Sequence, residues 1–271
     1  MPKLINLRIK NNDFQHIEVI KRNRYKRHKF QEFFIEGVRN INKAIENNWE
    51  IGSFIFSESK KLSNWAQDIL ANSKADLHFR LSDDLLKDIS DKEDTSELMA
   101  IVKVKKFEFT DIKLRKDLLV AVFDRPSNPG NLGTVIRSCE SFKVDALIIT
   151  GHSTDLYDPN TIKSSVGSFF SLPIFVLESH DKLTSLFEIL KTNSINYQIV
   201  GTSAKADKII DEVDLKLATF FIIGNETSGM SKSYSELCDI NVKIPIYGNA
   251  TSLNVGCATS IVLYEIDKQR R

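Results

Sequence analysis

The sequence predicts an α/β protein whose main sheet is mostly parallel and is preceded by a smaller α/β unit. From residue 118 onward, six apolar segments alternate with helical or polar ones, as parallel strands covered on both faces do. Between residues 33 and 104, shorter strands and helices alternate as well. The charged stretch 103–117 interrupts both patterns. We therefore expect a small domain over 1–107, a linker at 108–117 and a larger domain over 118–271.

Each apolar run has the length of a buried strand. The first region offers FFIEG, SFIFSES, LHFRLS and ELMAIVKV, and the second offers LLVAVFD, ALIITG, LPIFVL, YQIVGTS, TFFIIGN and INVKIPIYG. No run approaches the roughly 20 residues of a membrane helix, and the first residues lack the apolar stretch of a signal peptide, so we expect no targeting segment. With 42% hydrophobic and 27% charged residues, we expect a cytoplasmic protein without membrane attachment.

Basic charge is concentrated at the amino-terminal end. The first thirty residues hold nine Lys or Arg against two acidic residues, although the net charge of the whole chain is only +1. The run KRNRYKRHK has the composition of a surface that contacts RNA phosphates. A solvated helix face is the alternative. The candidate RNA-binding residues are Arg22, Arg24, Lys26, Arg27 and Lys29.

The three cysteines show no metal-site or disulfide spacing. Cys139, Cys238 and Cys257 are far apart and odd in number. We expect them to fill the core, and we expect no metal site. The chain also lacks a G-x-G-x-x-G after the first strand of the larger domain and lacks a P-loop, which argues against an ordinary dinucleotide or P-loop site.

The segment SNPGNLGTVIR, at 127–137, follows the first strand of the larger domain. A helix that starts near Asn131 would bury a stripe of apolar residues at 132, 135, 136 and 139 and leave Arg137 outside it. Gly130 and Gly133 would leave backbone N–H groups uncovered beneath the guanidinium, which suits an anion. Alternatively, Arg137 is a surface residue and Asn131 only caps the helix.

The segment GNETSGMS, at 224–231, follows the apolar strand TFFII. It turns sharply and presents one carboxylate, Glu226. That carboxylate either binds a ligand or fixes the loop by accepting backbone N–H bonds.

The segment IPIYGNATSLNVG, at 244–256, leads into the last helix. Ser252 or Asn254 would cap that helix. Gly256 lies inside it, at a cost of roughly 1 kcal/mol relative to alanine, so we expect close packing against another backbone. The loops after four strands, at 124–133, 201–203, 224–226 and 248–250, are expected to line one pocket, because ligands bind beyond the carboxyl ends of parallel strands.

Together, these segments resemble the motifs of the SpoU (TrmH-type) ribose methyltransferases of the SPOUT class. The first motif, N-x-G-x-x-x-R, is matched by Asn131, Gly133 and Arg137. The second, G-x-E-x-x-G-x-S, is matched by Gly224, Glu226, Gly229 and Ser231. The third is matched by Ile244, Pro245, Gly248, Ser252, Leu253, Asn254 and Val255. The resemblance covers 118–271 closely, and 20–105 resembles the small substrate-binding domain of such enzymes.

The resemblance implies a sheet with a deep trefoil knot, an exception to the rule that protein chains are unknotted. It implies S-adenosylmethionine as the cofactor, held largely by backbone groups of Thr202, Gly224, Ile244 and Leu253. It also implies a homodimer formed through the terminal helix and the first-motif helix.

The implied reaction is attack of a ribose 2′-hydroxyl on the methyl group of the cofactor. The candidate catalytic residues are Arg137, Asn131, Glu226, Ser252 and Asn254. We favour Arg137 as a phosphate anchor, because a guanidinium is a poor base. The expected substrate is structured RNA, not DNA, and ribosomal rather than transfer RNA. The alternatives are a tRNA 2′-O-methyltransferase and an RNA-binding protein of the same fold without turnover.

Two departures from the family pattern stand out. Gly256-Cys257 replaces the serine that commonly follows S-L-N-V, and TSEL at 95–98 replaces a glycine-containing turn. The first bears on cofactor binding and the second on the RNA substrate.

Overall fold

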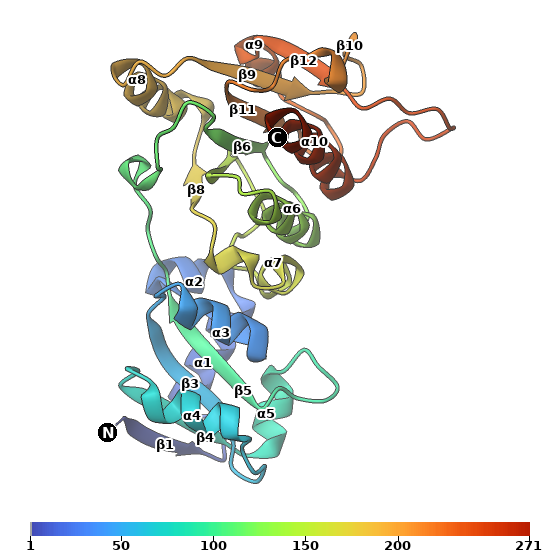
Figure 1. The fold of residues 1–271 in the computed structure, drawn as a ribbon. Helices are drawn as coiled ribbons and strands as arrows, with labels where there is room; N and C mark the ends of the chain where they lie inside the picture. Colours follow the sequence, from blue (N-terminus) through green and yellow to red (C-terminus); the bar gives the residue numbers. More distant parts are fainter. Residues whose placement is uncertain (1) are drawn as a thin grey trace. The chain divides into compact units, whose positions relative to one another are not determined.

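A computed structural model describes residues 2–271, which form two compact units. The first unit extends to Lys106 and also includes Tyr157–Phe170, and the second comprises Phe107–Leu156 and Ser171–Arg271. Figure 1 shows the elements of both units. Among residues 2–271, no helix has the length and apolar character needed to cross a membrane.

The first unit contains a five-stranded sheet in the order β1-β4-β3-β5-β2. Its strands are β1 (Lys3–Leu7), β2 (Glu32–Glu36), β3 (Ile51–Ser57), β4 (Leu77–Leu81) and β5 (Leu98–Lys103). The pairs β1–β4 and β3–β4 are parallel, and β5 runs antiparallel to β3 and β2. The four strands predicted for this region are confirmed, and β1 is an additional edge strand.

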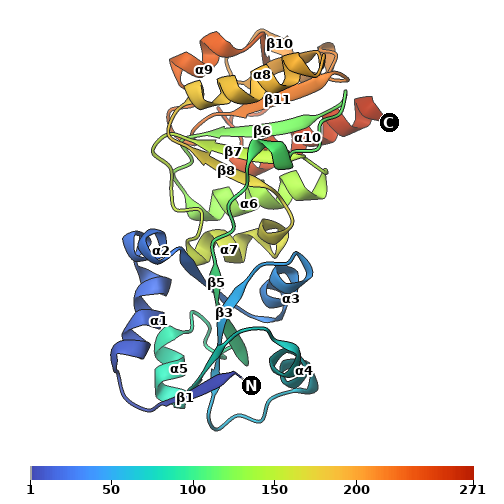
Figure 2. The ribbon, with the colours of Figure 1, turned by 90° about the vertical axis from the view of Figure 1, so that its left-hand side faces the viewer.

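Helices cover both faces of this sheet, as Figure 2 shows. They are α1 (Asn12–Arg22), α2 (Arg24–Phe30), α3 (Val38–Glu46), α4 (Asn64–Asn72) and α5 (Asp83–Ile89). Helix α1 contributes Phe14, Ile17 and Ile20, all fully buried, to a core shared with α5 and the sheet. The basic amino-terminal stretch is therefore part of the folded unit, because its apolar residues are buried.

A later segment completes the first unit. It contains α7 (Pro159–Ser165) and the 3-10 turn η2 (Ser168–Phe170). Phe169 and Phe170 pack against Phe33 and Trp49, and the Trp49 Nε1 group donates to the Phe170 carbonyl at 2.9 Å. This grouping differs from the predicted domains, in which 118–271 forms one domain, because aromatic side chains far apart in sequence share one core.

The second unit contains a seven-stranded sheet in the order β10-β12-β9-β11-β6-β7-β8, with every pair parallel. Its strands are β6 (Leu119–Asp124), β7 (Ala146–Thr150), β8 (Ile174–Leu177), β9 (Tyr197–Thr202), β10 (Lys208–Ile209), β11 (Ala218–Ile223) and β12 (Ile240–Lys243). All six predicted strands are present, and the short β10 is additional. Strand β12 ends earlier than predicted, just before Pro245, which has no N–H to donate.

Helices α6 (Pro129–Ser141) and α10 (Val255–Arg270) cover one face of this sheet, and α8 (Thr184–Thr192) and α9 (Lys232–Leu237) cover the other (Figure 2). Short 3-10 turns lie at η1 (Phe109–Asp111), η3 (His180–Leu183) and η4 (Ile210–Glu212). Phe107, Phe109 and Leu114 pack against the core on the α8 side. All of the predicted linker 108–117 therefore belongs to the second unit.

Helices α6 and α10 pack closely. The predicted α6 stripe is confirmed, because the four side chains have no exposed surface: Leu132, Val135, Ile136 and Cys139. The α6 hydroxyl of Ser138 lies 2.8 Å from that of Ser260 on α10. A Cβ at Gly256 would lie 2.6 Å from Thr134 Cγ2, so the glycine permits the close approach. Of the cysteines, only Cys139 is fully buried, and Cys257 is exposed on α10, contrary to the expectation.

We expect Gly256→Ala to lower the thermal stability, because the new methyl group overlaps Thr134 and overpacking typically costs about 1–3 kcal/mol. In a Thr134→Ala background, the same change should be neutral or stabilising, since alanine favours a helix by up to about 1 kcal/mol over glycine. Urea unfolding of the four proteins of this double-mutant cycle measures the coupling. Equal effects in both backgrounds would contradict the assigned contact.

Candidate active site

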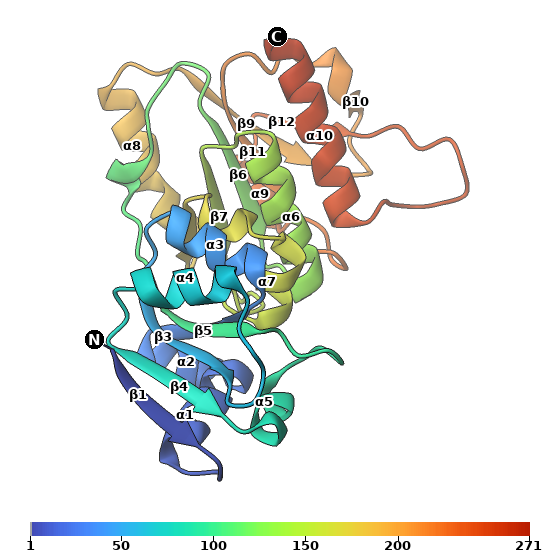
Figure 3. The same ribbon diagram turned by 60° about the horizontal axis from the view of Figure 1, so that its bottom comes forward.

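The carboxyl ends of four neighbouring strands lie along one edge of the second sheet. In sheet order these strands are β12, β9, β11 and β6. Because all are parallel, their following loops emerge on the same side, where α/β proteins bind ligands. The four loops therefore share one edge of the sheet, and the pocket that they are expected to line stays a prediction. Figure 3 shows the loop between β12 and α10 projecting from this part of the unit.

Glu226 joins two of these loops. Its Oε2 atom accepts hydrogen bonds from the Ser127 backbone N–H at 3.0 Å and from the Ser127 hydroxyl at 2.9 Å. Its Oε1 atom accepts from the Asn128 N–H at 3.1 Å and from Asn131 Nδ2 at 3.3 Å. Of the two roles left open by the sequence, the structure shows the second: Glu226 fixes a loop by accepting backbone hydrogen bonds.

These bonds keep the Glu226 carboxylate ionised. Burial is the largest single influence and raises its pKa, but the bonds from Ser127, from its own N–H and from Asn128 together outweigh burial. The pKa of Glu226 therefore lies below its ordinary value. An ionised acceptor suits this position, because all its partners are donors.

Two asparagines extend the network to the last helix. Asn254 Nδ2 donates to Asn131 Oδ1 at 3.0 Å, and Asn254 Oδ1 caps α10 by accepting from the Gly256 N–H at 2.9 Å. Helix α6 begins earlier than predicted, and its cap is Asn128, whose side chain accepts from the Asn131 N–H at 3.0 Å. Pro129 suits the first helical position because it lacks an N–H. Asn131 is therefore free to bridge Glu226 and Asn254.

The sequence reasoning missed Arg125 and the role of Asp124. Asp124 is 3% exposed, and its Oδ2 atom accepts from the Ser231 N–H at 2.8 Å. Hydrogen bonds to Asp124 raise the pKa of Arg125. The available signal was an acidic residue at the end of an apolar strand followed directly by a basic one, and only the fold shows that both face the 224–231 loop.

The remaining candidate catalytic residues lie outside this hydrogen-bonded network. Arg137 is exposed on α6, and its guanidinium is not bonded to any other residue of 2–271. Ser252 is exposed in the loop before α10. The structure thus brings Asn131, Glu226 and Asn254 into contact and leaves Arg137 free to bind a ligand.

The predicted cofactor residues lie at or near the same edge. Thr202 ends β9, Gly224 follows β11 and Ile244 follows β12, and these three strands are neighbours. Leu253 is 39% exposed, just before α10. Within the described chain, residues 245–253 form no hydrogen bond to another residue, so their backbone groups are available to a ligand. This arrangement fits a cofactor held mainly by backbone atoms. No group of three or more His, Cys, Asp or Glu residues within 2–271 is placed to hold a metal ion.

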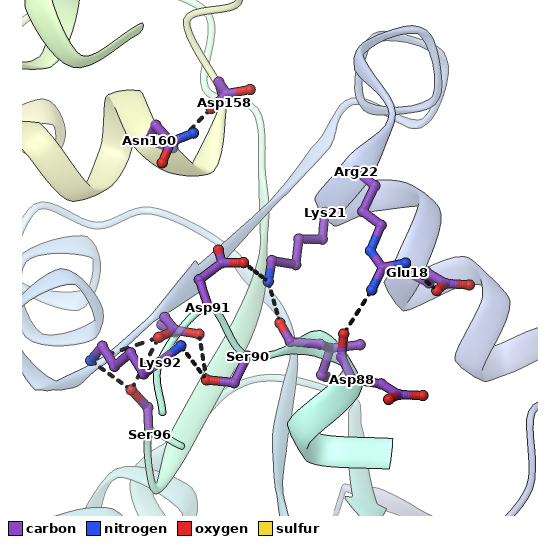
Figure 4. Close-up of polar contacts among 12 residues, drawn as sticks. Glu18, Lys21, Arg22, Asp88, Ser90, Asp91, Lys92, Ser96, Asp158 and Asn160 are labelled. Carbon is purple, nitrogen blue, oxygen red and sulfur yellow. Dashed lines mark hydrogen bonds and ion pairs between the residues drawn. The ribbon is translucent and has the colours of Figure 1, made fainter. Parts of the chain in front are cut away.

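The basic run is only partly a surface. Arg27 is 2% exposed, and its NH1 atom donates to the Ile20 and Lys21 carbonyls, so it must be removed from the predicted RNA-binding set. Arg22 is exposed but bonds Glu18 and the Asp88 carbonyl (Figure 4). Arg24 and Lys29 are exposed on α2, and Lys26 is half-buried. The run folds as two helices, and α2 presents the accessible charges.

Comparison with known proteins gives two family matches. Residues 118–264 match the SpoU rRNA Methylase family, and residues 11–100 match the SpoU L30e-like domain. The first match spans more than half of the chain. The chain therefore belongs to the SpoU rRNA methylase family.

Individual relatives match nearly the whole chain. The 23S rRNA (uridine(2479)-2′-O)-methyltransferase of Streptomyces viridochromogenes is 35% identical over 96% of this chain and 91% of its own length. The 23S rRNA (guanosine(2553)-2′-O)-methyltransferase RlmP of Bacillus subtilis is 25% identical over 89% of this chain and 90% of its own length.

A solved structure confirms the fold class. The SpoU methyltransferase AviRb from Streptomyces viridochromogenes, in complex with the cofactor AdoMet, superposes with a TM-score of 0.92 at 35% identity, covering 96% of this chain and 98% of AviRb. The protein thus has the α/β fold of the SpoU methyltransferases, and this fold implies the trefoil knot expected from the sequence.

Replacing Glu226 by glutamine tests the loop network. A glutamine places an NH₂ group against donors, so we expect the free energy of unfolding at neutral pH to fall by about 1–3 kcal/mol. Because the folded-state pKa is lowered, the stabilisation by the carboxylate is complete above the ordinary value of 4.5 and is lost as the pH falls through the folded-state pKa. Urea unfolding at pH 7 and at about pH 3 should therefore show a difference between wild type and Glu226→Gln that shrinks in acid. A pH-independent difference would contradict this role.

Proposed function

We propose that the protein transfers a methyl group from S-adenosylmethionine to a ribose 2′-hydroxyl of ribosomal RNA in the cytoplasm. One observation carries the proposal: the network of Glu226, Asn131 and Asn254 joins the three family motifs at the ligand-binding edge of the sheet. Support for a 23S rRNA substrate comes from the relative named for uridine 2479, which matches this chain almost from end to end.

Backbone groups near Thr202, Gly224, Ile244 and Leu253 would hold the cofactor. When bound, S-adenosylmethionine supplies an electrophilic methyl group, so the protein has to position the hydroxyl and accommodate loss of its proton. The backbone groups of 245–253 suit cofactor binding because they have no competing partners in the described chain.

Arg137 would anchor an RNA phosphate next to the target ribose. Its guanidinium is exposed and unpaired within the described residues, and the planar fork matches two phosphate oxygens. A guanidinium is not deprotonated in proteins, so the 2′-hydroxyl proton goes to another acceptor. Asn131 and Asn254 would fix the first turns of α6 and α10, and Ser252 would contact the ribose side of the site.

The first unit would bind RNA outside the reacting nucleotide. Arg22, Arg24, Lys26 and Lys29 remain as candidate contacts, and Arg27 supports them from the interior. The family model for residues 11–100 supports a domain of this kind. We favour ribosomal over transfer RNA because two full-length relatives carry 23S rRNA names.

A homodimer would form through α10 and α6. Cys257, Ile261 and Tyr264 follow one another at helical spacing on α10, and Ile261 and Tyr264 are 40% and 55% exposed. This apolar stripe supports a partner surface.

Ile261→Asp should convert a dimer to a monomer, because it places a charge in the apolar stripe. Sedimentation velocity measures the change. Val176→Asp is the matched control, since Val176 is 53% exposed on β8 of the same unit, and it should leave the dimer intact. A wild-type protein that sediments as a monomer would refute the dimer.

Removing Arg137 tests the proposed reaction. In cells that lack the gene, wild type should restore one 2′-O-methyl group on 23S rRNA, whereas Arg137→Ala should not, with a loss of at least about 100-fold in methyl transfer in vitro. Arg137→Lys keeps the charge without the fork and should fall in between. Calorimetry should show unchanged S-adenosylmethionine binding in both variants.

Three results decide between the alternatives. Methylation of tRNA instead of 23S rRNA would select the tRNA enzyme. Tight RNA binding without cofactor binding would select a non-catalytic binder. Full activity of Arg137→Ala would refute the role of Arg137.

A further inference from the structure

Arg125, the residue that follows β6, has an unusual backbone conformation. Its φ angle is 51°, in the left-handed region that residues with a side chain seldom adopt. Such a conformation persists only where the surroundings impose it, and residues of this kind cluster at functional sites. Asparagine and glycine adopt this region more readily than arginine, so the arginine side chain needs another explanation.

The side chain of Arg125 connects the end of β6 to the 224–231 loop. Its Nε and NH2 atoms donate to the two carboxylate oxygens of Asp124 at 3.0 and 2.9 Å. The NH2 atom also donates to the Gly229 carbonyl at 3.2 Å. Asp124 is almost completely buried and accepts from the Ser231 N–H of the same loop. The Arg125–Asp124 ion pair is therefore hydrogen-bonded to this loop at Gly229 and at Ser231.

The backbone of Arg125 is held on two further sides. Its N–H donates to the Thr150 carbonyl at the end of β7 at 3.0 Å. Its carbonyl accepts from Asn225 Nδ2 at 2.7 Å. Next to it, a Cβ at Gly151 would lie 2.8 Å from Arg125 Cγ, so only a glycine at 151 leaves room for the arginine side chain.

These contacts converge on the two sides of the Glu226 network. Asn225 directly precedes Glu226, and its Oδ1 atom accepts from the Thr227 and Ser228 N–H groups at 2.9 Å each, which shapes the turn. Ser127, which donates twice to Glu226, comes two residues after Arg125. Arg125 therefore fixes both the loop that carries the carboxylate and the loop that receives it.

We infer that Arg125 is a positioning residue for methyl transfer: its contacts with Asp124, Gly229 and Asn225 set the position of Glu226 and thereby of Asn131 and Asn254. The inference rests on the proposed function. Arg125 does not touch the reacting atoms, and its effect passes through the loop.

Arg125→Gly separates positioning from stability. Glycine adopts the left-handed backbone without strain, which offsets part of the cost of leaving the buried Asp124 carboxylate without its cation, so we expect a folded variant with a lowered thermal midpoint. Without the side chain, the 224–231 loop loses its hydrogen bond from Arg125 to the Gly229 carbonyl. We therefore expect kcat to fall by about 10–100-fold, while the Kd for S-adenosylmethionine changes by no more than about twofold. Amide exchange of residues 225–229 should become faster in the variant, which is a readout independent of activity.

Lys143→Gly is the matched control. Lys143 also has a left-handed backbone, with φ 55°, and an exposed basic side chain, and it follows the carboxyl-terminal end of α6, the opposite end of that helix from Asn131. It should gain or keep stability, with unchanged kcat and unchanged exchange at 225–229. Arg125→Lys keeps the charge next to Asp124 but cannot reach both its oxygens and Gly229, so it should recover part of kcat.

The outcomes separate this inference from the proposed function. Wild-type kcat and unchanged loop exchange in Arg125→Gly overturn the inference and leave the function intact. A wild-type protein that methylates no RNA refutes the function, whereas the exchange measurement still tests the positioning role. If Arg125→Gly does not fold, Arg125→Asn is measured by the same criteria, because asparagine tolerates the left-handed region. Failure of both variants to fold makes Arg125 a folding residue and overturns the inference.

Discussion

The candidate site depends on one carboxylate that holds two loops together. Strands β6 and β11 are neighbours in the sheet, so the loop that follows each lies within reach of the other. Glu226, on the second loop, accepts the N–H groups of Ser127 and Asn128 on the first, where the chain enters α6. Charge-assisted bonds of this kind are stronger than neutral ones. The sheet sets the distance between the loops, and the carboxylate sets their conformation.

Close packing of α6 against α10 connects these two loops to the third motif. Gly256 brings the two helices together at Thr134, and the Asn131–Asn254 hydrogen bond joins them near their amino-terminal ends. Asn128 caps α6 and Asn254 caps α10, so the last residue of each loop also fixes the start of the helix that follows it. Motifs that are more than a hundred residues apart in sequence thus share a few polar groups. The glycine at 256 therefore serves the geometry of the site as well as the packing of the two helices.

Local pattern revealed the strands but not the long-range partners. Apolar runs bounded by turn residues identified all six predicted strands of the second unit, because buried parallel strands have a continuous apolar signature. The basic residues of the amino-terminal region indicated only an RNA-contacting surface or a solvated helix face, and they concealed the buried face of α1, with Phe14 and Ile17. Arg27 is buried because carbonyl groups of α1 accept its hydrogen bonds. The sequence pattern does not show that α2 folds back so that Arg27 reaches those carbonyls.

The site residues show the same division between local and distant causes. The motif spacing identified Asn131, Glu226 and Asn254, but only the folded structure shows that Asn131 is hydrogen-bonded to both of the others. The conformation of Arg125 has no local signal beyond the following Pro126, which disfavours a right-handed helical backbone before it. Its left-handed φ is held by contacts with Thr150, at the end of β7, and with Asn225 and Gly229, in the loop after β11.

The chain connectivity also shows why the two units cannot be separated by a cut in the predicted linker. The chain passes from one unit to the other at three places, after Lys106, after Leu156 and after Phe170. A fragment that ends near residue 107 lacks Phe169 and Phe170, and it leaves Trp49 without its carbonyl partner. In the second unit, the Thr154 N–H donates to the Pro126 carbonyl, just before the chain enters the aromatic core of the first unit. The segment that completes the first unit is therefore continuous with a stretch that is hydrogen-bonded to Pro126, on the loop whose N–H groups bind the Glu226 carboxylate.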